Sequence, residues 1–189
     1  MVASSPSVVT PERFAAGKTY DDYRASFTEY GNVYDENYEA THVSAQDAKE
    51  LAELVARPGG PAKVLVITEN WCPDCFREVP VIAKIAEASG MELRVVERDQ
   101  HKDIMAEFRK NGEFESIPVF VFYTKDHEYI THFIERSRYA DAHIGDMRVG
   151  TEGMSQEERS THNAKFREEN WGTWRQATIT ELKETFANR

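Results

Sequence analysis

The sequence has no excess of basic residues and no long hydrophobic run. Its 189 residues include 33 acidic and 23 basic side chains, which give a formal net charge of -10. This balance disfavours nucleic acid and anionic membrane surfaces as main partners. No apolar stretch approaches the roughly 20 residues that a membrane-spanning helix needs, and residues 1–10 lack the basic and apolar segments of a secretory signal. We therefore expect a cytoplasmic protein.

Patterns that would hold a metal or a nucleotide are also missing. The sequence has two cysteines, whereas a closed zinc site needs four ligands. Its six histidines are scattered, with no pair at the spacing of metal ligands. The glycines are dispersed and form no phosphate-binding loop. We expect no metal and no bound cofactor, only a disulfide that the two cysteines can form and reopen.

The two cysteines, Cys72 and Cys75, stand one helical turn apart and follow an apolar stretch. Two intervening residues allow a disulfide to close or open with little backbone movement. A helix that begins here would place unpaired N–H groups and its positive dipole end near Cys72, which favours the thiolate. In a reducing compartment such a pair is rarely a structural crosslink. The spacing therefore predicts reversible thiol–disulfide exchange.

Apolar patterns predict alternating strands and helices over residues 61–136. Strands are expected at residues 63–68, 91–97, 118–123 and 129–134, with the last two joined as a hairpin. Helices are expected at residues 73–89, with Pro80 inside, and at residues 99–110. A strand–helix–strand half followed by a strand–strand–helix half indicates an α/β fold with a central mixed sheet of about four strands flanked by helices.

Residues 1–60 are predicted to form a helical extension packed on this core. Aromatic side chains recur at three- and four-residue steps between positions 20 and 38, which predicts one helix interrupted only at Gly31. This aromatic stripe either packs on the domain or forms a ligand-binding box. A second helix is expected to begin at Ser44 and to end before Pro58.

Residues 137–189 are predicted to form a second helical extension. Ser155 and Glu158 have the spacing of a capping box, which predicts the start of a long polar helix. Its apolar side consists of Trp171, Trp174, Leu182 and Phe186. A break is expected at Gly172, and the apolar side either packs on the domain or joins two copies, so monomer and homodimer both remain open. We expect the core and both extensions to form one structural domain.

Three features of the core resemble the thioredoxin family. Residues 71–75, Trp-Cys-Pro-Asp-Cys, resemble the family's active-site motif and differ in the dipeptide between the cysteines. Pro80 matches the proline that kinks the active-site helix, and residues 116–118, Ser-Ile-Pro, resemble the loop that carries a cis-proline. The resemblance covers residues 62–135 and implies a thioredoxin-like fold. The extensions look like those of a bacterial branch of uncharacterised thioredoxin-family proteins.

The resemblance also implies roles for these residues. Cys72 would be the exposed nucleophile, and Cys75 would be the buried thiol that resolves the mixed disulfide. Ile117 and a cis Pro118 would lie against an extended substrate peptide. Trp71 would line the rim of the site, unless it fills the core instead.

The dipeptide between the cysteines would touch the substrate and affect the thiolate. Pro73 supplies no N–H, and Asp74 brings a negative charge close to the sulfur, so both work against the anion. We therefore predict a reducing couple and not a strongly oxidising one. Stabilisation of the first helical turn is an equally good explanation for Asp74.

Two positions depart from the family pattern. Thioredoxins carry a buried Asp six residues before the nucleophile and a partner Lys on the neighbouring strand, but here these places hold Val66 and Val95. Replacing both partners leaves no stranded charge, but it removes the usual proton acceptor for Cys75. Glu69 is the nearest carboxylate that could substitute, directly or through water, and its alternative is a solvated loop residue.

Taken together, the residues and the resemblance predict a thiol–disulfide oxidoreductase. It would reduce protein disulfides through Cys72 and Cys75 and be recharged by a separate reductase. A peroxidase is disfavoured because Glu69 stands where peroxiredoxins have Thr, and a glutaredoxin is disfavoured because no basic cluster lies near the cysteines in sequence. The remaining alternative is a thioredoxin-fold module that binds or senses without efficient turnover.

Overall fold

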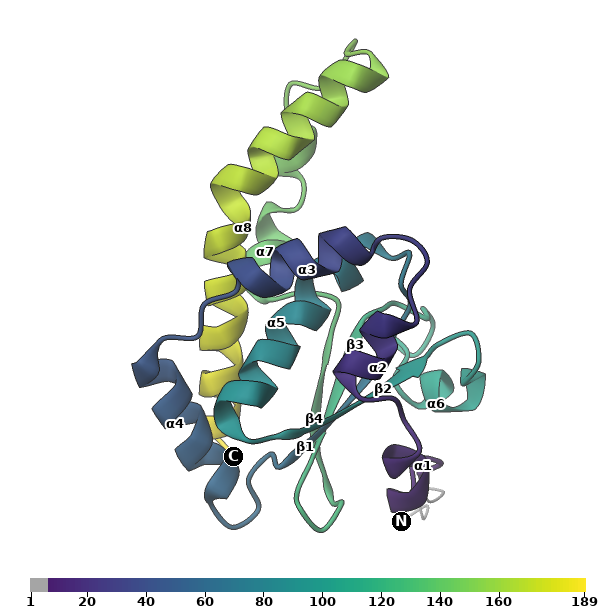
Figure 1. Cartoon of the computed structure of the whole chain (residues 1–189), viewed down its shortest axis with the longest axis vertical. Coiled ribbons are helices and arrows are strands. Elements are labelled where there is room, and N and C mark those ends of the chain that lie inside the picture. The colour runs from purple at the N-terminus through teal and green to yellow at the C-terminus, as the bar shows by residue number, and fades with distance from the viewer. Residues whose placement is uncertain (1–6) are drawn as a thin grey trace.

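The computed structural model describes residues 7–189 and contains a four-stranded sheet with helices packed around it (Figure 1). The strands are β1 (Lys63–Thr68), β2 (Glu92–Glu97), β3 (Val119–Tyr123) and β4 (Tyr129–Ile134). Their order in the sheet is β2-β1-β3-β4. Strand β2 runs parallel to β1, while β3 runs antiparallel to both β1 and β4. This arrangement confirms the predicted mixed sheet.

The two inner strands, β1 and β3, supply the centre of the hydrophobic core. Every residue from Val64 to Thr68 is buried, as is all of β3, because an inner strand has another layer on each face. Val66 lies opposite Val95 in the register between β1 and β2, and both are buried. The two positions that depart from the family pattern are therefore neighbours, and both side chains belong to the apolar core.

Helix α5 (Pro73–Ser89) begins directly after Cys72 and follows the predicted bounds. Pro73 occupies the first turn, where its missing N–H leaves no hydrogen bond unmade. Pro80 lies inside the helix, and Gly90 ends it with a φ of 76°, a left-handed conformation that favours glycine. Helix α6 (Lys102–Glu107) is shorter at both ends than predicted.

The N-terminal extension contains α1 (Pro11–Ala15), α2 (Tyr20–Ala25), α3 (Gly31–Ala40) and α4 (Ala45–Ala56). The prediction of one helix over residues 20–38 is wrong, because the chain turns between α2 and α3 with Tyr30 at a φ of 62°. Gly31 begins α3, at a point where a Cβ would lie 2.5 Å from the Arg24 guanidinium. Helix α4 has the predicted Ser44 cap. Residues 1–6 of the predicted extension lie outside the described residues.

The aromatic stripe of this extension packs on the domain, as one of the two alternatives predicted. Tyr23 and Tyr34 are fully buried, and the ring of Phe27 lies edge-on to both, with centroids 4.6 and 4.8 Å away. Tyr34 also lies edge-on to Phe76 of α5, with centroids 5.7 Å apart. The helical spacing therefore identified the buried face correctly, although the backbone breaks within it.

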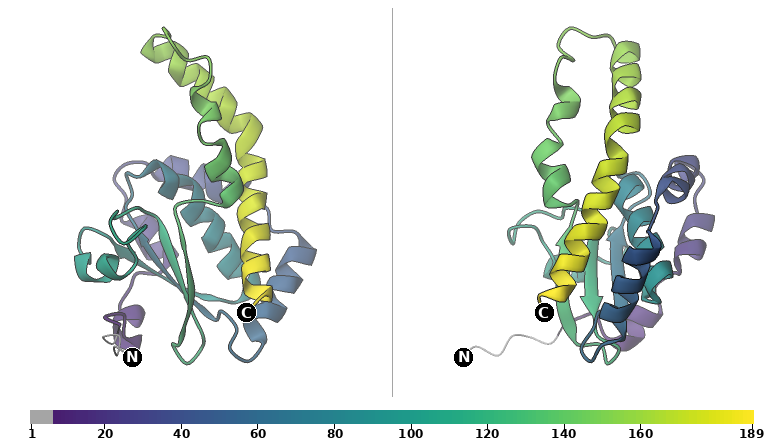
Figure 2. Two further views of the ribbon diagram at one scale, coloured as in Figure 1. Left: turned by 180° about the vertical axis from the view of Figure 1, so that it is seen from behind. Right: turned by 90° about the vertical axis from the view of Figure 1, so that its left-hand side faces the viewer.

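The C-terminal extension contains α7 (Arg138–His143), the 3-10 turn η1 (Asp146–Arg148) and α8 (Gln156–Ala187). Ser155 and Glu158 form the predicted capping box. The predicted break at Gly172 is wrong, because α8 is continuous. One glycine inside a helix costs only about 1 kcal/mol, and the buried side chain of Trp174 helps to offset it. Figure 2 shows the first half of α8 projecting beyond the sheet, while α7 lies against its second half, where Arg138 pairs with Glu181 and Glu184.

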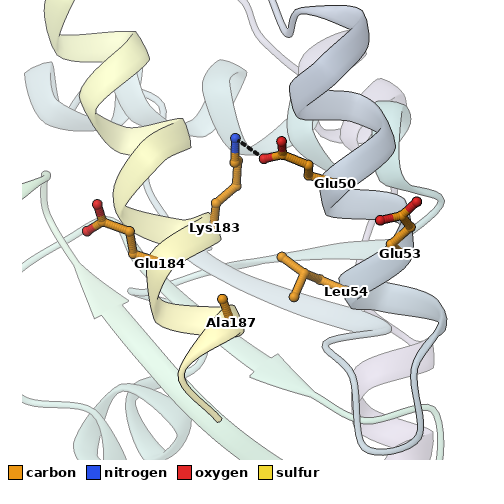
Figure 3. Close-up of a pocket in the computed structure, with 6 residues that line it drawn as sticks. All are labelled: Glu50, Glu53, Leu54, Lys183, Glu184 and Ala187. Atoms are coloured by element: carbon orange, nitrogen blue, oxygen red, sulfur yellow. Dashed lines mark ion pairs between the residues drawn. The ribbon is translucent and has the colours of Figure 1, made fainter.

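The second half of α8 packs on α4 and α5. Leu182 and Phe186 are buried, and the Phe186 ring lies edge-on to Phe122 of β3, with centroids 4.9 Å apart. Lys183 forms ion pairs with Glu50 of α4 (Figure 3) and, at 2.6 Å, with Asp47. Trp174, Leu182 and Phe186 of the predicted apolar side are thus covered within the chain, whereas Trp171 is half-buried. Although α8 is 32 residues long, no helix within residues 7–189 is long and apolar enough to cross a membrane.

Candidate redox site

The two cysteines lie where β1 leads into α5. Cys72 is the N-cap of α5 and Cys75 lies one turn inside it. Both are free thiols, and Cys75 is fully buried. Only 7% of Cys72 is exposed, so the prediction that its thiol is exposed is wrong. The loop before β3 covers it: the Cys72 thiol donates a 3.6 Å hydrogen bond to the carbonyl oxygen of Ile117.

The loop opposite the cysteines has the predicted backbone. The peptide bond between Ile117 and Pro118 is cis, and β3 begins at the next residue, Val119. The main chain of Ile117, and no metal-binding side chain, therefore faces the Cys72 sulfur. Within residues 7–189, no three His, Cys, Asp or Glu side chains gather in a way that could hold a metal ion.

The two thiols differ in how readily they ionise. A hydrogen bond with the Cys75 thiol lowers the pKa of Cys72, and so do the backbone N–H groups of Cys75 and Asp74; burial and the Asp74 charge work in the opposite direction. Burial raises the pKa of Cys75 well above its ordinary value. Cys72 is therefore the thiol that ionises first, while Cys75 retains its proton.

Trp71 lies at the rim of the site and not in the core. It is 46% exposed, so the core-filling alternative is wrong. The guanidinium carbon of Arg98 lies over its ring, 5.3 Å from the centroid, within the range of a cation–π interaction. Trp71 thus presents an exposed aromatic ring next to Cys72, covered on one face by an Arg98 that is itself paired with Asp99.

Glu69 is buried, so the alternative of a solvated loop residue is wrong. Only 8% of it is exposed, and its Oε1 accepts a 2.8 Å hydrogen bond from the backbone N–H of Asp99. Burial raises the pKa of this carboxyl group above its ordinary value. Among the described residues, no hydrogen bond connects the Glu69 carboxylate directly to either thiol.

The polar neighbours of Cys75 are hydroxyl groups. Thr68 is fully buried, and its hydroxyl, which has no hydrogen-bond partner among the described residues, works to lower the pKa of the Cys75 thiol. Tyr34 is also fully buried and donates a 3.3 Å hydrogen bond to the carbonyl oxygen of Glu69. Sequence reasoning missed both, although Thr68 directly precedes the loop that leads to the cysteines and Tyr34 belongs to the aromatic stripe.

Asp74, the acidic residue between the cysteines, is held by two arginines. Arg77 Nη2 lies 2.8 Å from Asp74 Oδ1. Arg136 binds both oxygens, with Nη2 2.5 Å from Oδ2 and Nε 3.2 Å from Oδ1. Burial works to raise the pKa of Asp74, but its interactions with Arg136 and Arg77 outweigh burial and hold that pKa below its ordinary value. Asp74 is therefore an ionised, paired carboxylate.

A buried ion network continues from Asp74 to α8. Arg77 Nε donates a 2.8 Å hydrogen bond to Glu78 Oε1, and the Thr178 hydroxyl donates a 2.9 Å hydrogen bond to Glu78 Oε2. The Arg77 guanidinium also lies 5.0 Å from the ring centroid of Trp174. Sequence reasoning missed this network; an Arg-Glu pair inside the apolar α5 segment was the available signal. Arg136 offered no local signal at all.

The comparisons with known proteins agree with this fold. The sequence model of a family described as Thioredoxin matches residues 17–148. The fold is similar to that of a protein of unknown function from Pseudomonas aeruginosa, with a TM-score of 0.66, 14% identity, and coverage of 97% of this chain and 99% of that chain. It is also similar to an HIV epitope-scaffold, with a TM-score of 0.65, 15% identity and the same coverage. At these identities the likeness concerns the fold alone. No curated protein matches.

Proposed function

The chain belongs to the thioredoxin family, and from this premise we propose that it is a thiol–disulfide oxidoreductase that reduces protein disulfides. The observation that carries the proposal is the asymmetry of the two thiols. Hydrogen bonds lower the pKa of Cys72, whereas burial raises that of Cys75. A nucleophile that ionises first and a neighbour that holds its proton are what a two-step exchange requires.

In the proposed reaction, the Cys72 thiolate attacks one sulfur of the substrate disulfide. A Cys72–substrate disulfide forms, and the other substrate sulfur leaves and takes up a proton. Cys75 then loses its proton and attacks the Cys72 sulfur, which releases the second substrate thiol and forms the Cys72–Cys75 disulfide. Two electrons pass from the two cysteines to the substrate. A separate reductase must then supply two electrons to reduce the Cys72–Cys75 disulfide again. We place this cycle in the cytoplasm.

We propose that the substrate polypeptide lies along the loop opposite the cysteines. The Ile117 carbonyl already accepts a hydrogen bond from Cys72, so an extended chain next to Ile117 and Pro118 would bring its disulfide to the nucleophile. Trp71 and Pro73 would border the same chain on the helix side. The negative charge of Asp74 opposes the thiolate, which supports a reducing couple; equilibration with glutathione buffers measures this directly.

Catalysed reduction of insulin is the experiment that tests the activity. The wild type, kept reduced by dithiothreitol, should accelerate insulin precipitation, whereas Cys72→Ser should leave only the rate of dithiothreitol alone. Cys75→Ser should form mixed disulfides with protein partners and fail to release them. Wild-type protein with both thiols reduced but no acceleration of insulin reduction would overturn the proposed activity.

We propose that Glu69 accepts the Cys75 proton through water. Its raised pKa brings the carboxylate closer to the neutral range in which a proton acceptor works well. Glu69→Gln retains an oxygen for the Asp99 N–H and should slow the second step by about tenfold, with the first step unchanged. Single-turnover release of thionitrobenzoate from its mixed disulfide with Cys72 measures the second step. Glu113→Gln, at an exposed residue, is the control; equal rates in all three proteins would exclude the role.

The low exposure of Cys72 favours one further candidate function. A sulfur that is covered by the Ile117 loop fits a module that engages one particular partner and does not turn over generic substrates. That alternative predicts no insulin reduction by the wild type, together with a covalent complex between Cys75→Ser and a single protein in cells. Insulin reduction and several trapped partners favour the general reductase.

A further inference from the structure

Arg136 is a basic residue at the end of the core sequence whose side chain contacts the active-site motif. It lies directly after β4 and before α7, 62 residues along the chain from Asp74. Its Nε and Nη2 atoms contact both carboxylate oxygens of Asp74, at 3.2 and 2.5 Å. This two-point contact matches the planar guanidinium fork to the carboxylate and fixes the carboxylate's orientation.

The position of Asp74 makes this contact relevant to the chemistry. Asp74 lies in the first turn of α5, between the two cysteines, and its charge disfavours the Cys72 thiolate. The carboxylate is also largely shielded from water, with 21% of its side chain exposed. A partly buried charge of this kind acts over several ångströms with little screening.

Arg77 alone does not compensate this charge. Its guanidinium is shared with Glu78, which is fully buried and 2.8 Å from Arg77 Nε. Arg136 supplies the second positive charge, and its own further partners are Asp141, at 2.7 Å, and Glu135, at 3.4 Å. The side chain of Asp141 is 58% exposed, so water screens that interaction. The charged groups on this side of the motif are Asp74, Arg77, Glu78, Glu135, Arg136 and Asp141. Glu69 and Arg98 lie near its Trp71 end.

We propose that Arg136 is a positioning residue for the thiol chemistry: by holding both oxygens of Asp74, it weakens the repulsion between the acidic residue of the motif and the Cys72 thiolate. The inference rests on the proposed function only in treating Cys72 as the nucleophile. It assigns a role in the site to the segment between β4 and α7, next to the C-terminal extension. It also explains how the motif can contain an aspartate and still favour an ionised Cys72.

The test is the pH dependence of Cys72 alkylation by iodoacetamide in the reduced full-length protein. Arg136→Gln should raise the pKa of Cys72 by about one unit, as expected for one uncompensated charge a few ångströms away, and slow alkylation at pH 6 up to about tenfold. Arg136→Lys, which keeps the charge but loses the fork, should give a smaller shift of the same sign. Arg138→Gln is the control, because Arg138 is exposed and pairs with Glu181 and Glu184 of α8.

A second background separates this role from a merely structural one. In Asp74→Asn, the Arg136→Gln change should shift the pKa of Cys72 by less than half as much as in the wild type. Equal shifts in both backgrounds, or no shift in the wild type, would overturn the proposal. Far-UV circular dichroism checks folding. If Arg136→Gln does not fold, the shifts that Arg136→Lys causes in the wild-type and Asp74→Asn backgrounds are compared instead.

The outcome is independent of turnover, because alkylation reports on Cys72 whether or not insulin is reduced. A normal Cys72 pKa in Arg136→Gln with full insulin reduction removes the Arg136 role and leaves the proposed function intact. If Arg136→Gln shifts the Cys72 pKa as predicted but the wild type does not reduce insulin, the Arg136 role stands and the proposed function is removed.

Discussion

The two sides of the cysteine helix differ in where they carry charge. Toward the sheet, Val66 and Val95 are register partners on β1 and β2, and both are buried and apolar. Toward α8 and the end of β4, Asp74, Arg77 and Arg136 are ionised and largely shielded from water. The motif thus lies between a sheet side without buried ion pairs at Val66 and Val95 and an α8 side with several.

The contrast shows where buried charge is tolerated in this chain. Each ion on the α8 side has a partner at hydrogen-bond distance, and Thr178 satisfies the remaining oxygen of Glu78. A buried, hydrogen-bonded ion pair need not stabilise a fold, but removing one of its two members lowers the stability because the other charge stays buried and unpaired. On the sheet side both members of the family's pair are replaced together, so no unpaired charge remains.

The largest expected effect comes from placing a charge on the apolar side. Val66→Asp buries a carboxylate opposite Val95 without a cation and should lower the free energy of unfolding by about 4 kcal/mol at pH 7. Urea unfolding monitored by tryptophan fluorescence measures the loss. Val149→Asp, at a valine that is 68% exposed, should leave the midpoint unchanged. A loss below about 1 kcal/mol for Val66→Asp would show that the sheet side accepts charge after all.

The next effect comes from breaking the ionic side. Arg77→Met leaves Glu78 buried without its cation and should cost about 3 kcal/mol of stability at pH 7. Burial already raises the pKa of Glu78, and losing Arg77 raises it further. A carboxyl group whose pKa is higher in the folded state destabilises that state as it ionises, so stability is lost as pH rises.

The loss in Arg77→Met should therefore be smaller at pH 5 than at pH 8. Urea titrations of wild type and variant at both pH values give the four free energies needed. The same loss at pH 5 and pH 8 would mean that Glu78 does not become the unpaired charge. Arg138→Gln again serves as the control, since its side chain is 79% exposed.

The smallest effect is expected at the ion pairs between α4 and α8. Lys183 contacts Glu50 (Figure 3) and also Asp47 near the protein surface, with 22% of its side chain exposed. Lys183→Met should cost about 1 kcal/mol, because water screens such pairs. Lys165→Met, on the projecting half of α8, should change nothing measurable. A loss at Lys183 as large as that at Arg77 would remove the distinction between surface and buried ion pairs.

Local signals allowed much of the fold to be predicted. The caps Ser44 and Ser155 begin α4 and α8, and Pro73 and Gly90 bound α5. Each acts through hydrogen bonds or dihedral angles within a few residues, so its effect can be read without the rest of the chain. The predicted break at Gly172 failed because packing along α8 outweighs the low helix propensity of one glycine.

Other features depend on contacts that sequence order does not reveal. Tyr30 takes a left-handed conformation between α2 and α3 while its ring stacks on Phe76 of α5, with centroids 5.2 Å apart. Cys72 is covered because a loop 45 residues away brings the Ile117 carbonyl to its sulfur. Neither arrangement has a signature in the neighbouring residues.

Local sequence was enough to place a pair of thiols at the mouth of a helix, because spacing, capping and backbone geometry act over a single turn. The charge around those thiols could not be read in the same way. Coulomb energies depend on distances between groups that folding brings together, and the arginine that binds Asp74 most closely comes from 62 residues away. The motif therefore supplies the polar groups nearest to Cys72, and the fold decides which cations pair with Asp74.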